Sequence, residues 1–272
     1  ATAGNIFVSS DAALRVKDLT TQAATANTVD IRTTGGKAIV FDSTGTYANV
    51  SGSGTANNGD AINVVTDTTG GTVTFNKALD AGSITVSAGD AVVVNQNLST
   101  TAVNTSGGGA GSNAVSGGVT LTAAGSISGA GTISTGSATA DDASTGGTST
   151  TATSGSISLT ATGANVQLGK LTTGAATVSN VNEGASTDTA TAGTISLSGA
   201  SLGTSTGTPQ TLALGSGTGG AASVGGLLNL TATAGNIFVS SDAALRVKDL
   251  TTQAATANTV DIRTTGGKAI VF

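Results

Sequence analysis

The segment ATAGNIFVSSDAALRVKDLTTQAATANTVDIRTTGGKAIVF forms residues 1–41 and returns unchanged as residues 232–272. Forty-one consecutive identities at an offset of 231 residues are incompatible with chance or slow divergence. Self-similarity at a fixed period indicates a repeat architecture. We therefore expect residues 1–231 to be one complete tandem-repeat unit, and 232–272 to begin the next identical unit of the same continuous solenoid. Because both ends fall within repeating sequence, we expect the chain to be a window on a longer array.

The composition favours an all-β structure and excludes several kinds of chemistry. The 272 residues include 41 Gly but one Pro and no Cys, His, Trp or Met, and 9% are charged, whereas about 25% is usual. Val, Ile and Thr are plentiful and favour strands. Without His or Cys, most nucleophilic and redox mechanisms lack their side chains, and a disulfide framework is excluded.

The charge balance disfavours polyanionic partners. The formal charge is −5, and residues 1–231 carry six Lys or Arg against twelve Asp or Glu, so each unit adds six negative charges. This accumulation argues against nucleic acid or an anionic membrane as a partner. No apolar run reaches the roughly 18 residues that would span a bilayer.

Seven short stretches share an alternation of apolar and polar residues. They are VDIRT (29–33), INVVT (62–66), SITVS (83–87), GVTLT (118–122), SISLT (156–160), TISLS (194–198) and LLNLT (227–231). Most are followed by Gly and a second strand-like run, such as KAIVF (37–41), GTVTF (71–75), AVVVN (91–95), NVQLG (165–169) and NIFVS (236–240). Cutting the chain before these stretches gives the segments 29–60, 61–80, 81–116, 117–154, 155–192, 193–225 and 226–259, which together span 231 residues.

The alternation predicts which side chains face inward, because successive residues of a strand point to opposite faces. The inward pairs are Val29/Ile31, Ile62/Val64, Ile84/Val86, Val119/Leu121, Ile157/Leu159, Ile195/Leu197 and Leu228/Leu230, with Ile6/Val8, Val73/Phe75 and Val166/Leu168 from the second runs. Burial of the five or six aliphatic side chains of one segment would stabilise it by about 1.5–3 kcal/mol each. Ordering its backbone costs about 1–2 kcal/mol per residue in conformational entropy, so one segment cannot fold alone. Each segment therefore needs neighbours above and below, as in a solenoid.

These observations predict an all-β fold, a right-handed parallel β-helix with about seven rungs per 231-residue repeat. At about 4.8 Å per rung, the repeat would advance about 34 Å. The stretches 106–116, 138–154 and 181–192 contain few aliphatic residues and are expected to be polar corner loops outside the core.

Charged residues offer few candidates for catalysis or metal binding. Asp141, Asp142, Glu183 and Asp188 lie in loops, and Asp30 and Arg32 are outward neighbours. Arg15, Lys17 and Asp18 lie in ALRVKDL (13–19), where alternation puts Leu14 and Val16 inward and Arg15 and Lys17 outward. We expect solvated charges and surface ion pairs, so no catalytic, cofactor-binding or metal site is assigned. Weak Ca²⁺ binding by the loop carboxylates is a minor alternative.

The Thr-x-Thr pairs and the few large aromatic residues each have two possible interpretations. The Thr-x-Thr pairs Thr72/Thr74, Thr151/Thr153, Thr189/Thr191 and Thr231/Thr233 could order water, as in ice-binding proteins, but they fall at different places in their segments, so a flat repeated row is not expected. Phe7, its copy Phe238, Phe41 and its copy Phe272 are the unusual large residues. Each is expected to be covered by a loop or to make a lateral contact between fibres, with loop cover favoured; Tyr47 and Val65 have the same two readings.

The rungs GGVTLTAAGSISGAGTIST (117–135) and GSISLTATGANVQLGKLTT (155–173) resemble the repeats of filamentous-haemagglutinin-like proteins, which are giant secreted bacterial proteins with long β-helical shafts. The resemblance covers most of the chain in style and implies an extracellular or cell-surface location with a role in adhesion or cell contact. The long loops and the identical 231-residue super-repeat depart from it and favour a fibre protein.

The expected function is therefore mechanical: a non-enzymatic structural repeat of a long extracellular fibre, whose partners are copies of its own repeat. An adhesin shaft that binds cells or glycans through its corner loops is the alternative. A polysaccharide-active β-helix enzyme is a lesser one, since it would need converging carboxylates.

Overall fold

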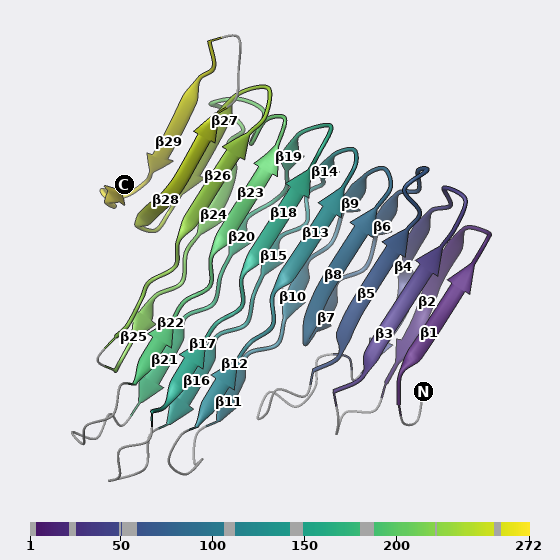
Figure 1. Cartoon of the computed structure of the whole chain (residues 1–272), viewed down its shortest axis with the longest axis horizontal. Helices are drawn as coiled ribbons and strands as arrows, with labels where there is room; N and C mark the ends of the chain where they lie inside the picture. The colour runs from purple at the N-terminus through teal and green to yellow at the C-terminus, as the bar shows by residue number, and fades with distance from the viewer. Residues whose placement is uncertain are drawn as a thin grey trace.

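The computed structural model describes residues 4–21, 26–48, 50, 59–105, 112–141, 149–179, 188–220, 222–252 and 257–272. Across these ranges the secondary structure consists of 30 β-strands. The strands stack side by side along one long axis from the N-terminal to the C-terminal end (Figure 1). A search of the same ranges finds no helix that is long and apolar enough to cross a membrane.

Every strand pairing is parallel, and the strands form five sheets. The ten-stranded sheet contains β1 (Ile6–Ser10), β3 (Thr28–Thr33), β5 (Ala61–Thr66), β8 (Ser83–Ala88), β13 (Val119–Ala123), β18 (Ile157–Ala161), β23 (Ile195–Gly199), β26 (Leu228–Ala232), β28 (Leu245–Thr252) and β30 (Ile270–Val271). The six-stranded sheet contains β2 (Leu14–Thr20), β4 (Ile39–Ala48), β6 (Val73–Phe75), β9 (Val92–Val94), β14 (Ile127–Ser128) and β19 (Val166–Gln167).

The remaining three sheets contain seven, four and three strands. The seven-stranded sheet contains β7 (Leu79–Ala81), β10 (Leu98–Thr100), β15 (Ile133–Ser134), β20 (Leu171–Thr172), β24 (Gln210–Ala213), β27 (Ile237–Ser241) and β29 (Val260–Thr264). The four-stranded sheet contains β11 (Val103–Thr105), β16 (Ala138–Asp141), β21 (Ala176–Ser179) and β25 (Gly217–Thr218). The three-stranded sheet contains β12 (Asn113–Val115), β17 (Thr151–Thr153) and β22 (Thr189–Thr191).

The predicted parallel β-solenoid is confirmed. All seven alternating stretches identified in the sequence lie in the ten-stranded sheet, as β3, β5, β8, β13, β18, β23 and β26. Their inward residues pair in register, so that Val29, Ile62, Ile84, Val119, Ile157, Ile195 and Leu228 form one continuous row. Each of these side chains is buried, and the second inward row is buried as well. The core is therefore a stack of aliphatic rows that runs along the axis.

The repeat contains seven complete turns and one further half-turn. Within the ten-stranded sheet, seven steps lead from β1 to β26. The next strand, β27, has the same sequence as β1 but lies in the seven-stranded sheet on the other side of the coil. The expected segment 226–259 therefore holds one and a half turns where a single rung was predicted, because it contains β26, β27 and β28.

The alternation of LRVKDL is interrupted after Val16. In β2, Leu14 and Val16 point toward the core and Arg15 and Lys17 toward solvent, as predicted. The next inward residue is Leu19, so the pattern shifts by one residue.

The second copy shows the cause. Against β26, the strand β28 carries one extra residue, because Leu228 pairs with Val247 and Asn229 pairs with Asp249. Such a β-bulge breaks the period-two pattern while the strand continues.

The aromatic residue Phe41 is a core residue, which corrects the expectation that a loop or a neighbouring fibre would cover it. Phe41 is fully buried, and its ring stacks on Phe75 with centroids 4.6 Å apart and an interplanar angle of 19°. Tyr47 meets Phe41 edge-on at 5.9 Å and donates a hydrogen bond to the backbone oxygen of Val16. The β4 strand alternates so that Ile39 and Phe41 share the inward face.

The expected corner loops form a second structural layer, which we call the wing: the four-stranded and three-stranded sheets. The expectation that 106–116, 138–154 and 181–192 lie outside any core is wrong for their described parts. Val103, Ala114, Ala138, Ala140, Ala152, Ala176, Val178 and Ala190 form a separate buried cluster between the two sheets. Alanine is so small that this pattern carries little apolar signal in the sequence, yet it allows two sheets to pack closely. Figure 1 shows the wing projecting at one end of the rungs, beyond β7, β10 and β13.

Two ladders of glycine, which we call the neck, join the wing to the main core. One ladder comprises Gly82, Gly117, Gly155 and Gly193, and the other comprises Gly136, Gly174 and Gly215. A Cβ atom on Gly155 would lie 2.0 Å from the carbonyl oxygen of Gly117, and one on Gly193 would lie 1.9 Å from that of Gly155. Glycine is required here because the backbones of successive rungs approach too closely for any side chain.

Buried hydroxyl groups cross the neck and satisfy its backbone. Thr135 donates to the Gly155 oxygen at 2.6 Å and accepts from the Gly174 nitrogen at 3.2 Å, so it contacts two glycines of the following segment, 155–192. Thr100 repeats this arrangement one rung earlier, with Gly117 and Gly136 as its partners at 2.6 and 3.0 Å. Buried polar groups are tolerated when they are hydrogen-bonded. The two threonine hydroxyls thus provide hydrogen-bond partners for backbone N–H and C=O groups of the neck glycines, where the chain passes from the main core to the wing.

Replacement of Gly155 by Ala should destabilise the protein, because the new methyl group would collide with the Gly117 carbonyl. We expect a loss of about 1–3 kcal/mol or more, as for overpacking of a core, measured as a lower urea midpoint. Gly207→Ala is the matched control, since its nearest contact is the Ser205 Oγ at 3.7 Å. Equal effects of the two substitutions would contradict the role of the glycine ladder.

Thr135→Val keeps the shape of the side chain but removes the hydroxyl, which leaves the Gly155 oxygen and the Gly174 nitrogen without this partner. An orphaned buried polar group costs about 1–3 kcal/mol, so thermal unfolding should occur at a distinctly lower temperature. The control is Thr120→Val on the exposed face of β13, where the melting temperature should hardly change.

Candidate functional site

The outward face of the ten-stranded sheet, which we call the hydroxyl face, carries aligned Ser and Thr residues. One column comprises Thr85, Thr120, Ser158 and Ser196, and the other comprises Ser87, Thr122, Thr160, Ser198, Thr231 and Thr251. The parallel register sets each hydroxyl directly over its counterpart in the next rung, about 4.8 Å away. The alternation responsible is visible in VTLT, ISLT and ISLS once the segments are aligned.

The four Thr-x-Thr pairs do not form one row, as expected, because they lie in three different sheets. The columns of the hydroxyl face arise because Ser and Thr occupy equivalent positions in successive rungs. Even among those pairs, Thr151 and Thr153 of β17 lie in register with Thr189 and Thr191 of β22 in the wing. Thr74 lies in β6 and Thr231 in β26, so these two pairs do belong to different sheets.

The hydroxyl face is uncharged over its central rungs and available to water. Within the described part of the chain, the hydroxyls of Thr85, Ser87, Thr120, Thr122 and Ser158 make no side-chain hydrogen bond. Each can donate one hydrogen bond and accept others. The aligned hydroxyls of this face can therefore hydrogen-bond to water or to a polar ligand.

The charged candidates form surface ion pairs, in line with the expectation for them. Arg32 donates two hydrogen bonds to the carboxylate of Asp30, at 2.6 and 2.8 Å. Asn63 of the next rung donates to the same carboxylate at 3.2 Å. Arg15 pairs with Asp42, and Thr46 donates its backbone N–H to Asp18 at 3.1 Å. Lys17 is exposed on β2. Each contact joins a rung to itself or to an adjacent rung.

These partners shift the pKa values of the carboxyl groups downward. The hydrogen bond from Arg32 is the main reason that the pKa of Asp30 is lowered, and Asn63 acts in the same direction. For Asp42, the backbone N–H of Thr44 is the main cause of a lowered pKa, with Arg15 contributing. Burial opposes both shifts. The carboxylates are thus held ionised, as ion-pair partners are, whereas a general acid needs a raised pKa.

The loop carboxylates do not form a metal site among the described residues. Asp141 ends β16 and contacts the Ser179 hydroxyl at 3.4 Å. Asp188 is buried before β22 and accepts the backbone N–H of Thr150 at 2.9 Å, so one of its oxygens caps the preceding rung. Asp142 and Glu183 lie outside the described residues. In the ranges that the structure describes, no three His, Cys, Asp or Glu side chains gather closely enough to hold a metal ion.

Comparisons of the chain with protein-family models, with curated proteins and with solved structures find no match. The class that the geometry defines is therefore the fold itself, an all-β parallel solenoid with a wing.

The Asp30–Arg32 pair makes stability depend on pH. Because its folded pKa lies below the unfolded value of about 3.9, its contribution is present above that value and is lost as the pH falls through the folded pKa. Asp30→Asn should lower the melting temperature at pH 7, and the difference from the wild type should shrink as the pH falls below the unfolded pKa and disappear once Asp30 is protonated in the folded protein. Asp11→Asn is the control. A difference that persists in acid would show that the carboxylate charge does not act through this pair.

Proposed function

We propose that the chain is a length-building repeat of a long extracellular fibre, with a mechanical role and no catalytic one. The observation that carries this proposal is the way the second copy of the 41-residue segment joins the first unit. β28 pairs with β26, and β27 pairs with β24, in parallel registers that extend the same sheets. A new unit therefore lengthens the rod without a domain boundary.

The surface chemistry supports the same proposal. The core rows need a rung on either side, so repetition removes the apolar ends that a single unit would expose. The sides are covered by hydroxyls, ion pairs and a net negative charge, which favours solubility of a long rod. The resemblance to filamentous-haemagglutinin-like shafts favours a bacterial cell surface as its location.

Proteins with one, two and four complete units provide the test. Each added unit should lengthen the particle by seven and a half strand spacings, about 36 Å, in electron micrographs of negatively stained material, at constant width. Compact particles, or a length that does not increase in proportion to the number of units, would refute the fibre proposal.

Adhesion is the second candidate, because the wing is a separately built layer. It has its own alanine core and its own neck, and its strands stack in register from rung to rung. Such regular display would give multivalent binding. Cells or glycans that bind a four-unit rod, and bind much more weakly to a rod whose segments 106–111, 142–148 and 180–187 are replaced by Gly-Ser linkers, would support it.

A further inference from the structure

The first and second copies of the repeated segment have the same internal structure but different surroundings. In both copies the IFVSS strand pairs with the VDIRT strand, Ile6 with Val29 and Ile237 with Val260. In both, the LRVKDL strand pairs with the strand of the KAIVF run, Leu14 with Ile39 and Leu245 with Ile270. The 41 residues thus form one rigid pattern of two turns that the structure contains twice.

In the first copy, the apolar side of this pattern is open. Val8 is 41% exposed and Phe7 is 69% exposed. The lining of an open pocket between β1 and β2 includes six apolar residues, Ile6, Val8, Leu14, Val16, Leu19 and Ile31, together with Arg15, Lys17, Asp18 and Thr20. The pocket is the uncovered end of the main core.

In the second copy, strands of the same chain cover the equivalent residues. Val239 is 1% exposed and Phe238 is 9% exposed. Two parts of the preceding rung cover β27: the strand β24 pairs Gln210 with Val239, and the isolated bridge residue Leu202 pairs with Ile237. β26 covers β28, with Leu228 opposite Val247.

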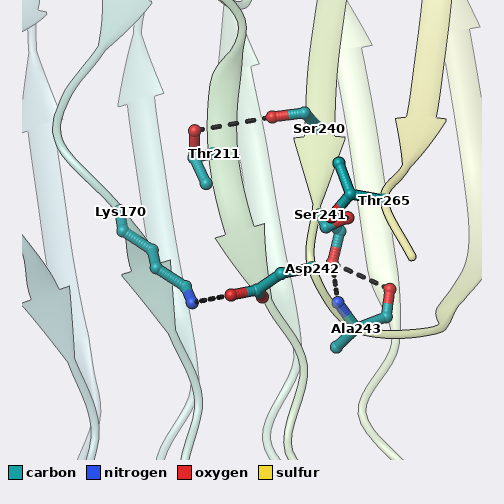
Figure 2. Close-up of polar contacts among 7 residues, drawn as sticks. All are labelled: Lys170, Thr211, Ser240, Ser241, Asp242, Ala243 and Thr265. Atoms are coloured by element: carbon teal, nitrogen blue, oxygen red, sulfur yellow. Dashed lines mark hydrogen bonds and ion pairs between the residues drawn. The ribbon is translucent and has the colours of Figure 1, made fainter. Parts of the chain in front are cut away.

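Polar side chains on the outer surface also link the second copy to the preceding rungs. Figure 2 shows the Thr211 and Ser240 hydroxyls facing each other across β24 and β27, 3.5 Å apart, and Lys170 reaching Asp242 at 2.6 Å. Asp242 is equivalent to Asp11 in the first copy. The hydrogen bond from Lys170 is the main cause of the lowered pKa of Asp242. Since Lys170 lies two rungs before β27, the contact also ties the new copy to the body of the preceding unit.

We infer that the open end formed by β1 and β2 is an assembly surface for a preceding repeat unit, and that it joins that unit with a half-turn. This inference rests on the proposed fibre and names its junction. The preceding unit would place its equivalent of β24 beside β1 in the ten-stranded sheet, and its equivalent of β26 beside β2 in the six-stranded sheet. Each sheet of one unit therefore continues as the opposite sheet of the next.

The half-turn has a consequence for the whole rod. Successive units are related by a rotation of 180° about the axis, combined with an advance of about 36 Å. The wings then project alternately from opposite edges, and the hydroxyl faces alternate between opposite sides. The complete axial repeat is two units, or fifteen strand spacings, about 72 Å. A junction of whole turns would instead put all wings on one edge, about 34 Å apart.

Cross-linking within the 272-residue chain distinguishes the two junctions, since it contains no natural Cys. The half-turn places Asn229 beside Asp249, whereas a junction of whole turns would place Asn229 beside Asp261. The variants are Asn229→Cys/Asp249→Cys and Asn229→Cys/Asp261→Cys, treated with a short bis-methanethiosulfonate reagent. Ser196→Cys/Asn229→Cys is the positive control, because these residues are paired within the unit itself.

We expect the 229/249 pair to cross-link as completely as the control and the 229/261 pair at least tenfold less. Efficient 229/261 cross-linking would overturn the half-turn, as would failure of 229/249 while the control reacts. Labels on Thr177→Cys in a four-unit rod supply a second measurement: they should alternate between opposite edges in micrographs, and labels along one edge would equally overturn it. Because rod length is measured separately, failure of the half-turn and failure of the fibre proposal remain distinguishable.

Discussion

Parallel stacking of each rung on the rung before it is the constraint on which the rest of this structure depends. A chain with 41 Gly and few large side chains cannot close a conventional globular core. By setting Ile, Leu and Val directly over one another, it instead forms rows in which every side chain has two like neighbours. The same register completes the backbone hydrogen bonds between rungs, so burial and hydrogen bonding are satisfied by a single arrangement.

The register has consequences on the outer surface and at the neck. Because residues stack on their equivalents, outward Ser and Thr become columns and glycine residues become ladders. The columns place hydroxyls in a regular field, and the ladders allow the backbone of one rung to touch that of the next. The wing depends on the ladders, since its alanine core can close only where the two sides of the coil approach. One repeated pattern thus generates a shaft and a separate outer layer.

The sequence predicts the shaft well because its evidence is local. In strands such as β18, Ile157 and Leu159 alternate with polar residues, and this suffices to place them inward and to align them with other segments. The wing escapes such reasoning, since Ala138, Ala140 and Ala152 resemble loop residues until another sheet is known to cover them. The half-turn escapes it for a different reason: aligning the stretches does not show whether the IFVSS strand of the next copy lies in the ten-stranded sheet or opposite it, because this depends on how the coil closes. The neck threonines, Thr100 and Thr135, are equivalent by alignment, but their hydrogen bonds involve residues 17 to 39 positions away.

The hydrogen bonds between rungs run along the axis of the rod, and this direction determines how it would respond to tension. Force along the axis acts on the backbone hydrogen bonds of one terminal rung at a time. These bonds would break in sequence, rung by rung, and would not be loaded together in shear. The rung of residues 117–154 rises about 4.8 Å when folded, but its 38 residues would reach about 130 Å when extended. A rod built in this way would lengthen by sequential release of rungs, and would absorb a sudden pull before its covalent chain was loaded.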